Sequence, residues 1–86
     1  MRESRTIMKN GKTLVIRLHE ESGFSAEVVE LDGRTVPWVD GVETLMQLFY
    51  RLIDKGCFTE SEESIYLYSK ELIYLYSKAI DDLGLA

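Results

Sequence analysis

Apolar and polar side chains alternate in parts of the first 38 residues, as in Ile16-Arg17-Leu18-His19 and Phe24-Ser25-Ala26-Glu27-Val28, a pattern typical of half-buried β-strands. The pairs Asn10-Gly11 and Asp32-Gly33 predict two-residue hairpin turns, and Glu21-Ser22-Gly23 predicts a three-residue loop. These turns delimit four expected strands, at residues 5–9, 12–20, 24–31 and 34–38. Pro37 has no N–H to donate, so the last of them lies at an edge. The pattern predicts a four-stranded antiparallel meander.

A helical period replaces this alternation after residue 40. The apolar side chains that recur at helical spacing are Val42, Leu45, Met46, Phe49, Leu52 and Ile53. Asp40 and Glu43 have the spacing of a capping box, and Gly56 is a typical helix stop. We therefore expect a helix over residues 41–55.

A second helix is expected over residues 60–83, with Thr59 and Glu62 as a second capping box and Gly84 as its stop. It contains a repeat, because residues 65–70 (Ile-Tyr-Leu-Tyr-Ser-Lys) recur as residues 73–78. Ile-Tyr-Leu-Tyr also favours a strand, in which a repeat of eight would keep its faces. The cap and the lack of a turn residue between the copies favour the helix.

In a helix the two copies present different faces, because eight residues rotate the second copy by roughly 80°. One apolar seam contains Ile65, Tyr68, Leu72, Leu75, Ala79 and Leu83, and a second contains Tyr66, Ile73 and Ile80. One sheet face cannot cover both seams, so the second is expected to contact a partner. The candidate interface residues of this helix are Tyr66, Ile73, Tyr74 and Ile80. The alternative is a neutral duplication without a role.

The elements together predict an α+β fold, a four-stranded antiparallel meander followed by two helices packed on one sheet face. At 86 residues the chain is expected to form a single domain, with the sheet in residues 1–39 and the two helices in residues 40–86.

The expected turns also set a register. They place Val15 opposite Val29, Arg17 opposite Glu27, Val29 opposite Val36 and Glu27 opposite Trp38. The core face would then carry Ile7, Leu14, Ile16, Leu18, Phe24, Ala26 and Val28. The free face would carry the second set of candidate interface residues, Val15, Arg17, Glu27, Val29, Val36 and Trp38. An apolar row rimmed by charge marks a contact site, although valine also suits any half-exposed strand.

The charge is unevenly distributed along the chain. The net charge is −5, but residues 1–17 hold five Lys and Arg against one Glu, a local +4 that leaves −9 for the rest. An acidic body binds phosphate poorly, so we expect no nucleic-acid partner. The basic stretch is interpreted as a frayed terminus or as an arm for an acidic partner. No apolar run is long enough to span a membrane, and we expect a cytoplasmic protein.

Candidate chemistry is sparse. His19 and Cys57 are the single residues of their types, so no metal-ligand set of known spacing is present. A Cys57–His19 nucleophilic pair can be drawn, but no motif flanks the cysteine. The glycines are scattered turn and cap residues and form no phosphate loop. We expect no cofactor, no metal and no small-molecule ligand.

Residues 12–54 resemble a group of short uncharacterised bacterial proteins. The residues that carry the likeness are Lys12-Thr13-Leu14-Val15-Ile16-Arg17, Val36-Pro37-Trp38 and the leucine-rich helix ending at Ile53-Asp54. The group has an aromatic residue within its Lys-Thr-aromatic-Val-Ile-Arg strand and usually Trp and Gly early in the next strand, where this chain has Phe24-Ser25-Ala26. The resemblance implies a fold and no activity.

The sequence thus predicts a small non-enzymatic protein-interaction module, a regulator or inhibitor that binds another protein or forms a homodimer. Small acidic phage inhibitors of host defence proteins offer an analogy. The alternatives are a Cys57-dependent enzyme and a nucleic-acid-associated protein that uses the basic N-terminus. A depressed thiol pKa would indicate the first, and a steep salt dependence of binding the second.

Overall fold

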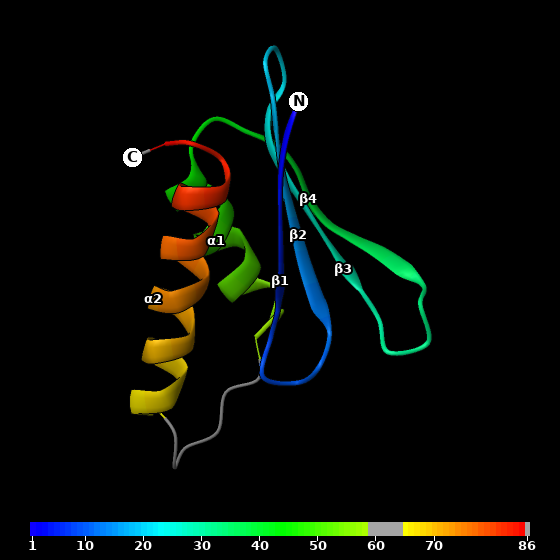
Figure 1. The fold of residues 1–86 in the computed structure, drawn as a ribbon, viewed down its shortest axis with the longest axis vertical. Coiled ribbons are helices and arrows are strands. Elements are labelled where there is room, and N and C mark those ends of the chain that lie inside the picture. The colour runs from blue at the N-terminus through cyan, green and yellow to red at the C-terminus, as the bar shows by residue number, and fades with distance from the viewer. Residues whose placement is uncertain (59–64, 86) are drawn as a thin grey trace.

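The computed structural model describes residues 1–58 and 65–85, and the side chains of α2 from Lys70 onward. Four strands are followed by two helices (Figure 1). The elements are β1 (Arg2–Ile7), β2 (Thr13–His19), β3 (Gly23–Val29), β4 (Thr35–Val42), α1 (Leu45–Asp54) and α2 (Ile65–Asp82).

The sheet has the order β1-β2-β3-β4, with every neighbouring pair antiparallel. Both helices lie on one face of it, α2 against β1 and α1 against β4 and β3 (Figure 1). This arrangement confirms the expected α+β fold. The core between the two layers contains Leu14, Ile16, Val28, Leu48, Leu52, Leu75 and Leu83, all almost fully buried.

The Asn-Gly and Asp-Gly hairpins have three-residue loops, and the expected two-residue turns are wrong. Met8 N–H donates to the carbonyl of Lys12 (2.8 Å), and Glu30 N–H donates to the carbonyl of Arg34 (2.7 Å). A type I′ turn needs a positive φ at both central residues, but no described residue other than glycine has one. Each loop instead places its glycine in the left-handed region, with a φ of +86° at Gly11 and +89° at Gly33.

This difference shifts β1 by one residue against β2 and exchanges its two faces. Ser4 pairs with Ile16 and Thr6 pairs with Leu14, so both polar side chains lie on the core face and are buried. Ile7, expected in the core, is exposed on the other face. Met8 takes the core position at the end of the strand.

The same shift affects β4. Val36 lies opposite Val28, and a bulge follows, after which Val39 lies opposite Ala26. The expected Val29–Val36 and Glu27–Trp38 pairs are therefore wrong, and Val36 shares the core-side face with Val28. Trp38 packs against the core instead of standing on the free face.

The β2–β3 pairing differs from expectation by two residues, which leaves the faces unchanged. Val15 lies opposite Glu27 and Arg17 opposite Ser25, where Val29 and Glu27 were expected. The loop before Gly23 consists of residues 20–22, one position earlier than predicted.

Helix α1 begins later than its sequence pattern predicts. Strand β4 continues to Val42, which pairs with Phe24, so the residues of the expected Asp40–Glu43 capping box lie in and directly after the strand. The observed box is Thr44 with Gln47: the Gln47 N–H donates to the Thr44 hydroxyl at 3.1 Å, and the side chain of Gln47 accepts from the Thr44 N–H. The sheet therefore extends past residue 39, the expected boundary.

Both helices end at the expected glycines. Gly56 N–H donates to the Ile53 carbonyl and Cys57 N–H to the Leu52 carbonyl, the bonding of a Schellman motif. Gly84 and Leu85 repeat this arrangement at the end of α2. The two copies of the repeat, residues 65–70 and 73–78, belong to one helix, which confirms the helix and excludes the strand. The expected Thr59–Glu62 cap lies outside the described residues.

Candidate functional site

The sheet face turned away from the helices carries a network of ion pairs. Nε of Arg17 lies 3.0 Å from Oε1 of Glu3, and Nε of Arg5 lies 3.1 Å from Oε2 of the same carboxylate. Arg17 also donates from Nη1 to Glu27. The hydrogen bond from Arg5 lowers the pKa of Glu3, and the hydrogen bond to Glu27 raises the pKa of Arg17. This end of the face is polar and internally paired.

Val15 lies within this network and is fully buried. Its neighbours on the same face are Arg5 and Glu27 on the adjacent strands and Arg17 two residues along β2. Val29 is half-buried between Thr13 and Thr35. The expected apolar row on this face is therefore not formed.

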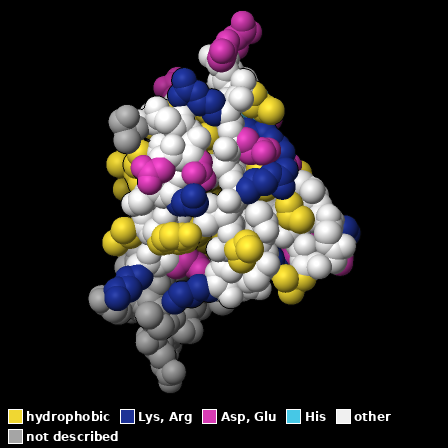
Figure 2. All heavy atoms as spheres, in the orientation of Figure 1, with side chains coloured by type: hydrophobic (Ala, Val, Ile, Leu, Met, Phe, Trp, Pro, Cys, Tyr) yellow, Lys and Arg dark blue, Asp and Glu magenta, His cyan; other side chains and the backbone are white. Residues whose placement is uncertain are grey.

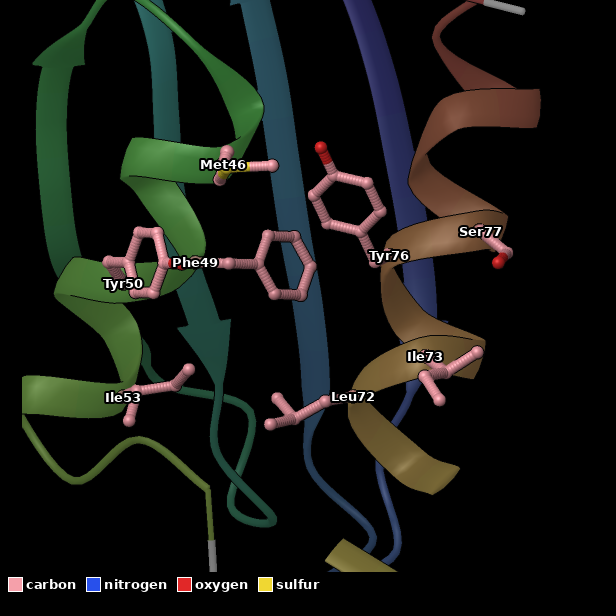
Figure 3. Close-up of a pocket in the computed structure, with 8 residues that line it drawn as sticks. All are labelled: Met46, Phe49, Tyr50, Ile53, Leu72, Ile73, Tyr76 and Ser77. Carbon is pink, nitrogen blue, oxygen red and sulfur yellow. The ribbon is translucent and has the colours of Figure 1, made fainter. Parts of the chain in front are cut away.

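The helix layer presents a different surface. An apolar groove runs between α1 and α2, and we call it the interhelical groove (Figure 3). Its lining residues are Met46, Phe49, Tyr50, Ile53, Leu72, Ile73, Tyr76 and Ser77. None of these side chains is charged, and its volume is about 260 Å³.

Aromatic rings form the floor of the interhelical groove. Phe49 and Tyr76 face one another from the two helices, with ring centroids 5.1 Å apart and planes at 71° (Figure 3). Phe58 stacks on Phe49 with centroids 6.1 Å apart. Edge-to-face pairs of this kind stabilise a fixed geometry beyond simple burial. The groove is therefore supported from below by packed rings.

The rim is made of large apolar side chains in contact with solvent. More than half of the residue surface is exposed at Met46 (54%), Tyr50 (63%), Ile73 (66%) and the adjacent Tyr74 (56%). Figure 2 shows hydrophobic side chains at the surface on both the helix side and the sheet side, interspersed with charged side chains of both signs. An exposed apolar patch of this kind marks a contact site.

A second apolar hollow lies on the other side of α2, against the end of β1. Tyr74 and Leu75 line it together with Ile7 and Met8. Oε2 of Glu71 accepts a 2.7 Å hydrogen bond from the backbone N–H of Lys9, which fixes α2 to the β1–β2 hairpin. The exposed ridge of α2 thus has an apolar depression on each flank.

The four candidate residues of the second helix seam have different positions. Ile73 and Tyr74 are exposed, and Ile73 lines the interhelical groove. Ile80 is half-buried against the core. The side chain of Tyr66 lies outside those that the structure describes.

Sequence reasoning missed the contribution of α1 to the groove. Met46 belongs to the apolar stripe that predicted the helix, but only Leu45, Leu48, Phe49 and Leu52 of this helix are buried. The signal was the width of that stripe, since Met46 and Tyr50 extend it past the arc that one sheet face can bury. The sequence predicts an apolar surface beyond what the sheet can bury only for the second helix.

Cys57 and His19 lie on opposite sides of the sheet. Cys57 belongs to the core, where burial raises the pKa of its thiol to about 11. His19 follows the outer-face alternation of β2, and its Nε2 lies 3.1 Å from the Ser25 hydroxyl. The two cannot act as nucleophile and base. Within residues 1–58 and 65–85 no cluster of three potential metal ligands occurs.

The basic N-terminal residues are used within the fold, and no free arm is formed. Arg2 donates to the carbonyl of Leu83 at 2.8 Å, at the negative end of the α2 dipole. Lys12 pairs with Glu30 at 2.8 Å, and Arg17 is paired as described above. These contacts leave little unpaired positive charge on β1 and β2 for an acidic partner.

Comparison with protein-family models, with curated proteins and with solved structures found no match to this chain. The resemblance of residues 12–54 stays a prediction. Neither α1 nor the described part of α2 has the length and apolar character needed to cross a membrane.

Proposed function

We propose that the protein is a small, non-enzymatic protein-interaction module whose contact surface is the interhelical groove. The observation that carries the proposal is an uncharged apolar groove whose rim residues Met46, Tyr50 and Ile73 are each more than half exposed. The largest exposed apolar patch on a monomeric protein is often functional.

The composition of the groove fits a protein partner better than a small ligand. Tyrosine and methionine are enriched at protein interfaces, because tyrosine buries a large area with a polar tip and methionine adapts its shape. Small-molecule sites usually enclose about 300–1,000 Å³ and bring several polar groups together. The polar side-chain groups of the lining are three hydroxyls, those of Tyr50, Tyr76 and Ser77, and the volume is about 260 Å³.

The mode of action that follows is binding. A regulator or inhibitor acts by occupying a surface and requires no reactive group, which agrees with a thiol whose pKa is raised to about 11. The free, buried Cys57 suits a reducing compartment, and we propose the cytoplasm as the location.

Site-directed photo-crosslinking in living cells of the native host tests this proposal. A benzophenone amino acid replaces Ile73 in the groove, and in a matched control it replaces Leu31, which is equally apolar and 74% exposed on the β3–β4 hairpin. We expect a discrete adduct from the Ile73 position and none from the Leu31 position. Equal labelling from both positions, or none from either, would contradict the proposal.

A further inference from the structure

The outward ridge of α2 has a sequence that is complementary to itself. Four residues of α2 follow one another at spacings of four, three and four positions: Lys70, Tyr74, Ser77 and Asp81. They therefore lie along one stripe of the helix, and all four are exposed. The stripe begins with a positive charge and ends with a negative one. A large side chain and a small one lie between them.

We infer that the occupant of the helix surface is a second copy of this chain, packed with its α2 antiparallel to the first across a two-fold axis. This inference rests on the proposed function and names its partner. When the axis passes between Leu75 and Tyr76, Lys70 lies opposite Asp81 of the second copy. An isologous interface repeats every contact, so two such charge pairs form.

The same axis places Tyr74 opposite Ser77 of the second copy. Ser77 is small and forms part of the α2 rim of the interhelical groove, so it leaves room for a tyrosine ring beside the groove. Ile73 then lies next to the contact on the α1 side. Antiparallel helices also align their dipoles favourably, and the uncharged lining avoids repulsion between two chains of net charge −5.

The size of the surface agrees with a dimer. The exposed residues Met46, Tyr50, Ile73 and Tyr74, taken as about 200 Å² each and a little over half exposed, offer roughly 450 Å² of largely apolar area. A standard interface buries about 800 Å² on each partner, of which a little over half is apolar. The apolar surface of α1 and α2 is therefore close to what one such interface uses.

Charge reversal followed by analytical ultracentrifugation tests the inference. We expect the unmodified 9.9 kDa chain to sediment as a dimer at micromolar concentration. Lys70→Glu and Asp81→Lys, each alone, should weaken self-association about tenfold, because both symmetric pairs become repulsive. An equimolar mixture of the two variants should restore the dimer, since every facing pair is again of opposite sign.

Recovery on mixing cannot come from misfolded chains, so it separates a lost contact from a lost fold. Arg34→Glu makes the same change in charge on the β3–β4 hairpin and should leave the dimer intact. A dimer that neither reversal weakens would overturn the inference. A chain that stays monomeric would also overturn the inference. In that case, a crosslinked adduct at Ile73 whose mass differs from that of the dimer would still support the proposed function.

Discussion

The Ser4 hydroxyl donates a 2.8 Å hydrogen bond to Oδ2 of Asp82, across 78 positions of the chain. Lys78 donates to the other oxygen of the same carboxylate at 3.2 Å, and Arg2 donates to the Leu83 carbonyl. The first strand thereby fixes the last turn of α2. The orientation of the exposed α2 ridge depends on this connection.

Asp82→Asn tests the connection through its pH dependence. The hydrogen bond from Ser4, followed by that from Lys78, lowers the pKa of Asp82 below its ordinary value of 3.8. A carboxyl group whose pKa is lower in the folded than in the unfolded chain stabilises the protein at pH values above its ordinary pKa. This contribution is lost as pH falls through the folded-state pKa. The variant should therefore be less stable than the unmodified chain at pH 7, with a difference that shrinks below about pH 4.

Urea unfolding at pH 7 and at pH 3 measures this difference. Asp40→Asn, at an exposed position of β4, serves as the matched control and should change stability little at either pH. A difference for Asp82→Asn that stays constant with pH would contradict a charged contact at this position.

Gly23 tests the close approach of β3 and β4. A Cβ on Gly23 would stand 2.3 Å from the carbonyl oxygen of Val42, whereas a Cβ on Gly33 would meet nothing within 4 Å. Both glycines have nearly the same φ, +86° and +89°, so Gly33→Ala measures the left-handed strain alone, about 1–2 kcal/mol. Gly23→Ala should cost at least about 3 kcal/mol in urea unfolding, because a backbone clash is added. Equal losses would show that β4 can move away.

The hairpin turns explain which parts of the fold could be predicted from the sequence. Asn-Gly and Asp-Gly suit a two-residue turn, but the same pairs fit a three-residue loop in which the Asn or Asp side chain bonds the backbone after the glycine. Asn10 Oδ1 accepts from Lys12 N–H at 2.9 Å, and Asp32 Oδ1 accepts from Arg34 N–H at 3.0 Å. The choice shifts the register by one residue, which exposes Ile7 and buries Ser4.

The candidate site was predictable only in part, because it lies between two elements. Hydrophobic periodicity assigned Ile73 and Ile80 to a second seam, of which Ile73 is exposed and Ile80 is half-buried against the core. Tyr74, also a candidate interface residue, is exposed. The pairing of α1 with α2 depends on tertiary packing, such as the Phe49–Tyr76 contact, which no local pattern encodes. The prediction of a free apolar sheet face is wrong, because the strands pair in a different register from the expected one.

Thr44→Ala tests the observed start of α1. Loss of the side chain that accepts from Gln47 N–H should cost about 1 kcal/mol in thermal or urea unfolding. Asp40→Ala and Glu43→Ala, which remove the cap expected from the sequence, should cost less than half as much. A larger loss at Asp40 than at Thr44 would place the start of the helix earlier than Leu45.

Cys57 offers a test against thiol chemistry. Burial is the main cause that raises the pKa of its thiol from 9.0 to about 11, so stability should fall as pH rises between these values, where the unfolded chain loses its proton first. Cys57→Ala should remove that decline. At pH 8 the folded protein should react with a thiol reagent at least about a hundredfold more slowly than the unfolded chain. A reaction that titrates below pH 8 would instead favour a Cys57-dependent enzyme.

Methionine oxidation tests most directly the claim that the helix surface is a contact site, because the three methionines have three different environments. Met1 is exposed, Met8 is buried in the core and Met46 is on the rim of the interhelical groove. Oxidation by peroxide is followed by mass spectrometry over a range of protein concentrations. We predict that Met46 becomes protected as concentration rises, while Met1 stays reactive and Met8 stays protected throughout. Met46 oxidised as readily as Met1 at every concentration, and equally so inside the native host, would contradict the account.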